Sequence, residues 1–260
     1  MADSTWPGAG EGRGLSPRAL ACATLFVSLG LAAAMPTQAA QLAAEPAVVI
    51  PAPALDPAPP AGSSLQRIVL AGGCFWGPQV VYEHVKGVTQ TLAGYVGKPQ
   101  ASAHPETADS GAAGATEAVE DAESVQVTFD PRQISLGKVL QIYFSVMHNP
   151  TELNYQGPDV GTQYRSEIFY ANDEQKRVAA AYIGQLDKAH VFDAPIVTKL
   201  EVLKGFYPAE DYHQDFAVTH PSYPYIVFND LPKVENLKRM FPDYYRDAPV
   251  TVLASNKPTQ

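Results

Sequence analysis

Cysteine is scarce in this chain, since Cys22 and Cys74 are the only two among 260 residues. We expect Cys22 to be removed with an N-terminal signal, which leaves Cys74 alone. One cysteine cannot form an internal disulfide, so a disulfide-stapled secreted fold is excluded. The same count excludes a Cys-x-x-Cys oxidoreductase and a cysteine-rich zinc module. Any thiol chemistry must therefore depend on Cys74.

Clusters of positive charge and paired histidines are missing as well. The net charge is -9 and no basic cluster occurs, which argues against nucleic acid and anionic membrane surfaces as partners. The 6 histidines never show paired ligand spacing, although His213 stands in an acidic stretch. We therefore expect neither nucleic acid nor a bound metal.

The N-terminal apolar run is too short for a typical membrane span. Residues 1–44 combine Arg13 and Arg18 with an apolar run over 19–34 and small residues suited to cleavage, a pattern typical of a secretory signal. An uncleaved membrane anchor is the alternative, but it would need about 20 apolar residues. We predict a secreted or periplasmic protein without stable membrane insertion.

The remaining chain divides into a linker, a domain and a tail. Residues 45–64 are dense in Pro and Ala, which predicts an extended, semi-rigid linker without a core. Residues 65–247 are predicted to form a single catalytic domain, and residues 248–260 a flexible tail.

Cys74 lies in a glycine-rich turn between a predicted strand at 67–71 and a predicted helix. Pro78 suits the first turn of that helix, where its missing N–H costs nothing. The free N–H groups and the helix dipole favour a thiolate at this position, so the pKa of Cys74 is predicted to fall below that of free cysteine. Phe75 and Trp76 add an aromatic wall beside the sulfur. A buried structural cysteine would not need these features together.

Strands and helices alternate along the predicted domain. This order predicts an α+β fold with helices packed on a small mixed sheet. A stretch poor in large apolar residues, 98–123, indicates a long surface loop. Further strands are predicted at 87–95, 124–129, 166–170 and 196–203, and further helices at 136–147, 172–188 and 231–240.

The turn around Cys74 reads GCFWG, and several further motifs follow it. Together they make the chain similar to the peptide methionine sulfoxide reductases of class A, from residue 67 to about residue 246. The resemblance implies a two-layer, ferredoxin-like sandwich and thiol-dependent reduction of methionine-S-sulfoxide, free or in proteins. The other matching stretches are GVTQT at 87–91, Gly94-Tyr95, Asp130-Pro131, HNPT at 148–151, QGPDVGTQYRS at 156–166 and FYPAEDYHQ at 206–214.

A sulfoxide needs an acid and hydrogen-bond donors at its oxygen, a thiolate at its sulfur and an apolar slot for its methyl group. The resemblance implies Cys74 as the nucleophile and Phe75 and Trp76 as the substrate-binding wall. The family acid matches Glu123, seven positions before Asp130. Glu117 is the rival, because Glu117-Ala118-Val119 resembles Glu123-Ser124-Val125; strand register favours Glu123.

Two further polar residues match the family, and two are missing. Tyr164 matches a hydroxyl donor to the sulfoxide oxygen, and Asp159 a carboxylate beside the cysteine. A second tyrosine donor of the family, and the histidine ahead of its acid, have no counterpart in the 98–123 loop. Because one lost donor costs roughly ten- to a thousandfold in rate, activity is expected to be weakened.

No second cysteine is available to resolve oxidised Cys74. The sulfenic acid that forms must then be reduced by an external thiol such as thioredoxin, glutaredoxin with glutathione, or dithiothreitol. No bound cofactor is expected, and the chain is expected to act as a monomer. Two other readings stay open: a cysteine hydrolase, which would want a histidine base, and a non-catalytic binder of oxidised methionine segments.

Overall fold

The computed structural model describes residues 46–59, 62–97 and 121–255. The predicted signal with Cys22, Glu117 with most of the predicted 98–123 loop, and the end of the predicted tail lie outside the described residues. The end of the predicted signal therefore stays a prediction. The prediction of a flexible tail is wrong for residues 248–255, because Val252 begins a short helix, is 6% exposed, and donates its N–H to the Asp215 carboxylate at 3.0 Å. Within the described ranges, no helix is long and apolar enough to cross a bilayer.

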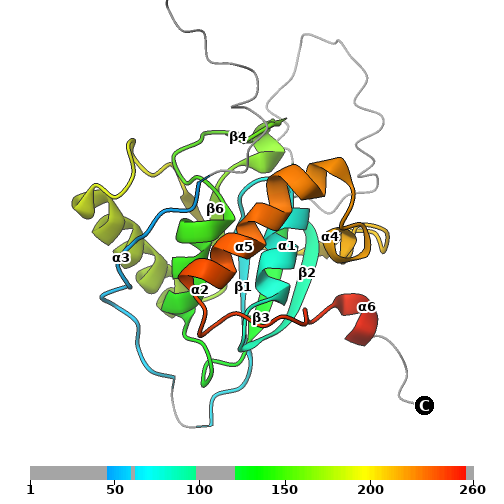
Figure 1. The fold of residues 1–260 in the computed structure, drawn as a ribbon. Coiled ribbons are helices and arrows are strands. Elements are labelled where there is room, and N and C mark those ends of the chain that lie inside the picture. Colours follow the sequence, from blue (N-terminus) through cyan, green and yellow to red (C-terminus); the bar gives the residue numbers. More distant parts are fainter. Residues whose placement is uncertain (1–45, 60–61, 98–120, 256–260) are drawn as a thin grey trace, which may run out of the picture. The chain divides into compact units, whose positions relative to one another are not determined.

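A mixed sheet of six strands has the order β7-β6-β1-β3-β2-β8 (Figure 1). Neighbouring strands are antiparallel except β6 and β7. The four inner strands stand in the order fourth, first, third, second of their occurrence, which is the ferredoxin-like arrangement. The predicted α+β class is confirmed. The strands are β1 (Gln66–Ala71), β2 (Val88–Val96), β3 (Ala122–Phe129), β6 (Glu167–Tyr170), β7 (Lys199–Val202) and β8 (Tyr207–Pro208), with a separate hairpin of β4 (Tyr155–Gln156) and β5 (Asp159–Val160).

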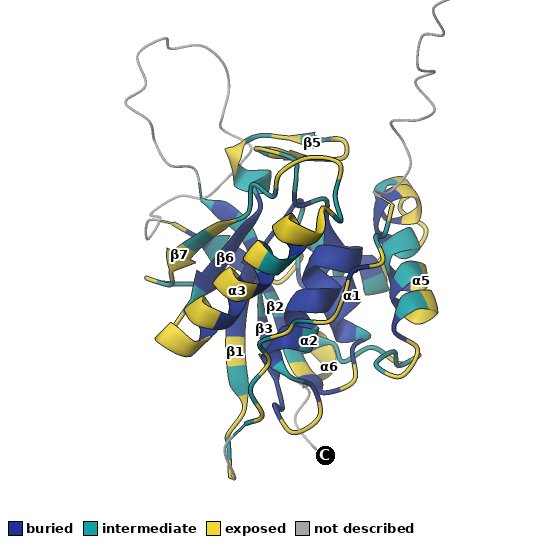
Figure 2. Cartoon of the chain, turned by 90° about the vertical axis from the view of Figure 1, so that its left-hand side faces the viewer, coloured by how far each residue is buried: buried dark blue, intermediate teal, exposed yellow. Residues whose placement is uncertain are grey.

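The longer helices share the large core with one face of the sheet. Figure 2 shows α1 and α2 buried, while α3 presents an exposed outer face. The α-helices are α1 (Trp76–Glu83), α2 (Leu136–Ile142), α3 (Asp173–Ala189), α4 (Phe216–Thr219), α5 (Leu231–Met240) and α6 (Val252–Ser255); a 3₁₀ turn, η4 (Thr162–Tyr164), and two π-helical turns, η3 (Tyr143–Met147) and η5 (Ile226–Asp230), complete them.

Strand β1 is buried on both faces. Ile68 and Leu70 join the core that contains the helices, whereas Val69 and Ala71 belong to a second apolar cluster, on which Phe206 packs. Alternating side chains of a strand point to opposite faces, so both layers hold β1 in place. The turn that follows β1 therefore starts from one of the most firmly held points of the sheet.

Most predicted elements appear near their predicted bounds. The C-terminal helix matches α5, and α3 begins after Asn172, whose side-chain oxygen accepts the Gln175 N–H at 2.9 Å. The predicted helix at 136–147 is α-helical only in α2 and continues as the π-helical η3. The predicted strand at 196–203 shrinks to β7.

The last part of the predicted linker is packed against the domain. Residues 46–59 are extended, as predicted, but the expectation that they have no core is wrong, because Ile50 is 6% exposed within the main core. The Tyr182 hydroxyl donates to the Pro51 carbonyl at 2.7 Å. The Asp56 carboxylate accepts the Gly137 N–H at 3.0 Å and so caps the start of α2. These contacts attach the segment beside α2 and α3.

Candidate active site

Cys74 lies in the short turn that joins β1 to α1. Gly73 takes a φ of +91°, a conformation that L side chains rarely adopt, and a Cβ there would lie 3.0 Å from the Gln156 side chain. The Gly73 N–H donates to the Tyr164 carbonyl at 3.2 Å. The turn thus requires glycine, and it ties the η4 segment to the cysteine.

Glu123, near the start of β3, reaches this turn. Its Oε2 accepts the Phe75 N–H at 3.1 Å, and its carboxyl group lies beside the Cys74 thiol. Burial raises the pKa of Glu123 to about 7, although the Phe75 N–H opposes that rise. Near neutral pH the Glu123 carboxyl can therefore both give and take a proton beside the sulfur.

The predicted polar residues Asp159 and Tyr164 lie on β5 and at the end of η4. Burial raises the pKa of Tyr164, and the negative charges of Glu123, Cys74 and Asp159 raise it further, so its hydroxyl stays protonated and can donate. Asp159 accepts a hydrogen bond from Tyr225, a residue that sequence reasoning missed. The tyrosine-rich stretch at 207–225 was the only signal for it in the sequence.

Aromatic rings surround the predicted wall residues Phe75 and Trp76. Phe75 is 2% exposed, and its ring centroid lies 5.5 Å from that of Tyr95 and 5.1 Å from that of His213. Trp76 stacks on Phe216 at 4.0 Å with an interplanar angle of 12°. Burial lowers the pKa of His213, which favours a neutral ring. The structure thus brings the thiol, an acid, a hydroxyl donor and an apolar aromatic cluster together.

Several known proteins are similar in sequence to this chain over most of its length. The family model of peptide methionine sulfoxide reductase matches residues 66–244. The chain belongs to this family. It is 55% identical over 191 residues to peptide methionine sulfoxide reductase MsrA 2 of Mesorhizobium japonicum, covering 74% of this chain and 95% of that protein. The MsrA 2 of Synechocystis sp. is 43% identical over 197 residues, 75% of this chain and 89% of that protein.

The solved structure of reduced Mxr1 from Saccharomyces cerevisiae is 30% identical and covers 65% of this chain and 92% of that chain, with a TM-score of 0.48. The two sequence relatives and the family model together confirm the predicted membership in the methionine sulfoxide reductases.

The start of α1 was predicted to lower the pKa of the Cys74 thiol, and in this member of the family it does not. Burial raises the pKa of Cys74 well above its ordinary value, and the negative charges of Glu123 and Asp230 add to the rise. The Trp76 N–H acts in the opposite direction but is outweighed. The prediction of a lowered pKa is therefore wrong. Its physical reason is first that the thiol is buried and second that carboxylates lie at the start of α1, where Glu123 accepts the Phe75 N–H.

Asp230, at the end of η5, is the carboxylate that sequence reasoning missed. Its side chain is fully buried, and the Lys233 ammonium lies 3.7 Å from Oδ1, beyond hydrogen-bond distance. A Cβ on Gly77 would come within 2.4 Å of the same oxygen, so Asp230 abuts the first turn of α1. Burial raises the pKa of Asp230 to about 6, and Lys233 limits that rise. At neutral pH an anion therefore lies behind the catalytic turn.

Replacing Asp230 by asparagine is expected to lower the pKa of the Cys74 thiol. The change removes a negative charge and leaves Lys233 as a net cation, and both effects stabilise the thiolate. The rate of Cys74 alkylation by iodoacetamide at pH 8 should rise several-fold. Asp247→Asn is the matched control, since this aspartate also pairs with a lysine of α5, at 3.4 Å, but its side chain is 87% exposed. An unchanged alkylation profile in Asp230→Asn would show that its charge does not reach the sulfur.

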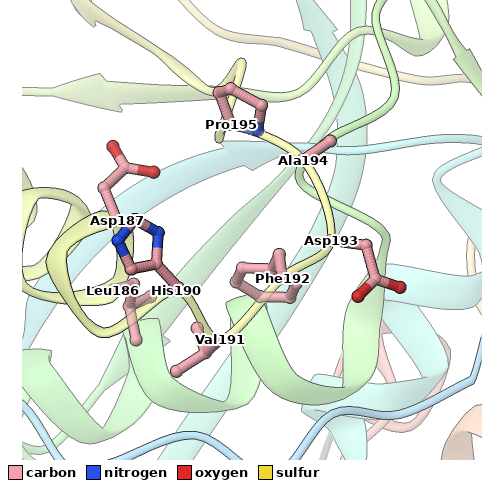
Figure 3. Close-up of a pocket in the computed structure, with 8 residues that line it drawn as sticks. All are labelled: Leu186, Asp187, His190, Val191, Phe192, Asp193, Ala194 and Pro195. Carbon is pink, nitrogen blue, oxygen red and sulfur yellow. The ribbon is translucent and has the colours of Figure 1, made fainter.

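A different pocket lies where α3 ends (Figure 3). Its volume is about 280 Å³, and Asp187 and His190 lie side by side at its edge. It shares no residue with the site around Cys74, and its lining contains no cysteine, serine or threonine. In the described part of the chain, no group of three or more His, Cys, Asp or Glu residues is arranged to hold a metal ion.

Proposed function

We propose that this protein reduces methionine-S-sulfoxide, free or within oxidised proteins, to methionine at the expense of an external thiol. The observation that carries the proposal is the contact of Glu123 with both the Cys74 thiol and the Phe75 N–H, beside an aromatic wall. A carboxyl group with a pKa of about 7 in contact with a thiol suits proton transfer during oxygen transfer. The function is repair of oxidised methionine.

In the proposed reaction the substrate methyl group packs against Phe75 and Trp76, and Tyr164 donates its hydroxyl to the sulfoxide oxygen. The thiol proton of Cys74 passes to Glu123, and Glu123 protonates the sulfoxide oxygen as the Cys74 sulfur attacks the substrate sulfur. The S–O bond of the substrate then breaks and its hydroxyl group passes to the Cys74 sulfur, while the S–S bond formed by the attack breaks and leaves its electron pair on the methionine sulfur. Methionine leaves reduced by two electrons, and Cys74 holds the oxygen and the proton as a sulfenic acid, oxidised by two electrons.

Two external thiols then restore Cys74. The first condenses with the sulfenic acid, releasing water and forming a mixed disulfide, and the second displaces Cys74 as a free thiol. Thioredoxin, glutaredoxin with glutathione, or dithiothreitol supplies these thiols in the proposal. The predicted signal at 1–44 supports a secreted or periplasmic location, where oxidants reach exposed methionines.

The competing hypotheses make different demands on the site. A cysteine hydrolase needs an imidazole base on its thiol, whereas the titratable group beside the Cys74 thiol is the carboxyl group of Glu123. A non-catalytic binder of oxidised segments needs no acid at the sulfur, and a buried carboxyl group there would only weaken the binding pocket. Both observations favour the reductase.

The decisive experiment is turnover of N-acetylmethionine sulfoxide with dithiothreitol, using separated S and R epimers. We expect methionine release from the S epimer alone, and complete loss of turnover in Cys74→Ser. Binding of the S epimer without turnover by the intact chain would overturn the reductase and support the binder. Ester or amide hydrolysis dependent on Cys74 would support the hydrolase instead.

A further inference from the structure

Tyr95 lies directly opposite Glu123 in the sheet. The two residues are register partners in the antiparallel pair of β2 and β3. Opposed residues of an antiparallel pair project from the same face, with Cβ atoms about 5 Å apart. The strands therefore place the Tyr95 ring beside the carboxyl group that contacts the Cys74 thiol. Unlike a loop residue, Tyr95 is held by ladder pairing on both sides, since β8 also pairs with it through Tyr207.

The environment of Tyr95 keeps its hydroxyl as a donor. Its ring packs on Phe75 at 5.5 Å with a tilt of 60°, and the side chain is only partly buried. Burial raises the pKa of Tyr95, and negative charge at Glu210, Glu123 and Cys74 raises it further. The register with Glu123 and the ring contact with Phe75 place Tyr95 beside the polar groups of the site. Within the described residues, no hydrogen bond occupies it.

The sulfoxide oxygen needs more donors than Tyr164 alone provides. Its negative charge grows as the S–O bond breaks, and each fixed donor aimed at it stabilises the transition state more than the ground state. The family's second tyrosine has no counterpart in the 98–123 stretch, so that position cannot donate. A free hydroxyl on the strand next to Glu123 can take over this task.

We propose that Tyr95 is a second hydroxyl donor to the sulfoxide oxygen and thus a catalytic residue of this protein. The proposal rests on the proposed reductase function. In this arrangement Tyr95 from β2 and Tyr164 from η4 both donate to the oxygen, and Glu123 supplies its proton. The oxygen-binding part of the site is then built in part on a paired strand.

The test is Tyr95→Phe, which keeps the ring against Phe75 and removes only the hydroxyl. We expect kcat for N-acetylmethionine-S-sulfoxide to fall by about ten- to a thousandfold with little change in KM, because the lost bond matters most in the transition state. Thermal unfolding and the alkylation profile of Cys74 should stay as in the unaltered protein. Tyr207→Phe is the matched control, since Tyr207 pairs with Tyr95 from the neighbouring strand β8 and its hydroxyl lies near Gly205.

A second readout separates a donor from a packing residue. Dimethyl sulfoxide bound to the Cys74→Ser variant should show its infrared S–O stretch at higher frequency when Tyr95→Phe is added, and not when Tyr207→Phe is added. Unchanged kcat and an unchanged stretch in Tyr95→Phe would overturn the proposal while the reductase function stands. Absence of turnover in the unaltered protein would instead refute the reductase function.

Discussion

Replacing Glu123 by glutamine is expected to lower kcat/KM for methionine-S-sulfoxide by a factor on the order of 10² to 10⁴ while making Cys74 more reactive toward alkylation. The amide cannot accept the thiol proton or protonate the sulfoxide oxygen, so the chemical step slows. The same change removes the charge that contributes most to the raised pKa of Cys74, so more thiolate is present at pH 8. Steady-state turnover and iodoacetamide labelling of one preparation measure both effects.

The pH dependence of this variant has a defined sign. Solvent must supply the proton that Glu123 gave, so the remaining activity should fall more steeply with rising pH than that of the unaltered protein. The stability of the folded protein, unlike its activity, should not suffer from the substitution above neutral pH. The pKa of Glu123 is raised from 4.5 to about 7 on folding, so the stability that its proton supplies is complete below pH 4.5 and lost as pH rises through 7. Above pH 7 the glutamine variant is therefore expected to have a thermal unfolding midpoint at least as high as that of the unaltered protein.

Glu117→Gln is the natural control, because sequence reasoning left Glu117 as the rival acid. It should retain most of the activity and leave the alkylation of Cys74 unchanged. A loss of activity in Glu117→Gln, with Glu123→Gln active, would assign the acid to the stretch before β3. Loss of activity in Glu123→Gln together with a slower alkylation would mean that the substitution distorted the turn around Cys74, and that the loss of activity does not report on proton transfer.

The chain's local patterns predict its central architecture well. The alternation of β3 and the helical spacing of α1, α2 and α3 each follow from side chains that must face one core. Register explains why Glu123 was preferred over Glu117, since the position seven residues before Asp130 is the second residue of β3. The structure places Glu123 beside Cys74, as that reasoning required.

The missed features depend on contacts between distant parts of the chain. Asp230 reaches the first turn of α1 across more than 150 residues, and Tyr225 reaches Asp159 across 66. Neither contact produces a periodic pattern of residues from which it could be predicted. The error on the thiol pKa has the same origin, because the sequence showed that Cys74 precedes a helix but showed neither the burial of the thiol nor the approach of Asp230. Likewise, a Pro-rich composition predicted an extended segment at 46–59 but could not show that Ile50 enters the core.

Without reductant, the protein is expected to release one methionine per chain and then stop completely. Cys74 is the free cysteine of the described residues, and the chain's other cysteine, Cys22, lies in the predicted signal. Oxidised Cys74 then has no internal partner, so it should remain a sulfenic acid after one turnover. Dimedone should label it in stoichiometric amount, and mass spectrometry of the intact protein should locate the adduct on Cys74.

Small thiols should restart turnover without any dedicated protein partner, because a sulfenic acid needs only a thiol to form the mixed disulfide. Dithiothreitol and glutathione can be compared directly, and a Cys22→Ser variant provides the control: it should behave as the unaltered protein at every step. An intramolecular disulfide after one turnover, lost in Cys22→Ser, would show instead that Cys22 is retained and resolves Cys74. The predicted signal cleavage and the external-thiol mechanism would then both be wrong, since a resolving cysteine makes the first external thiol unnecessary.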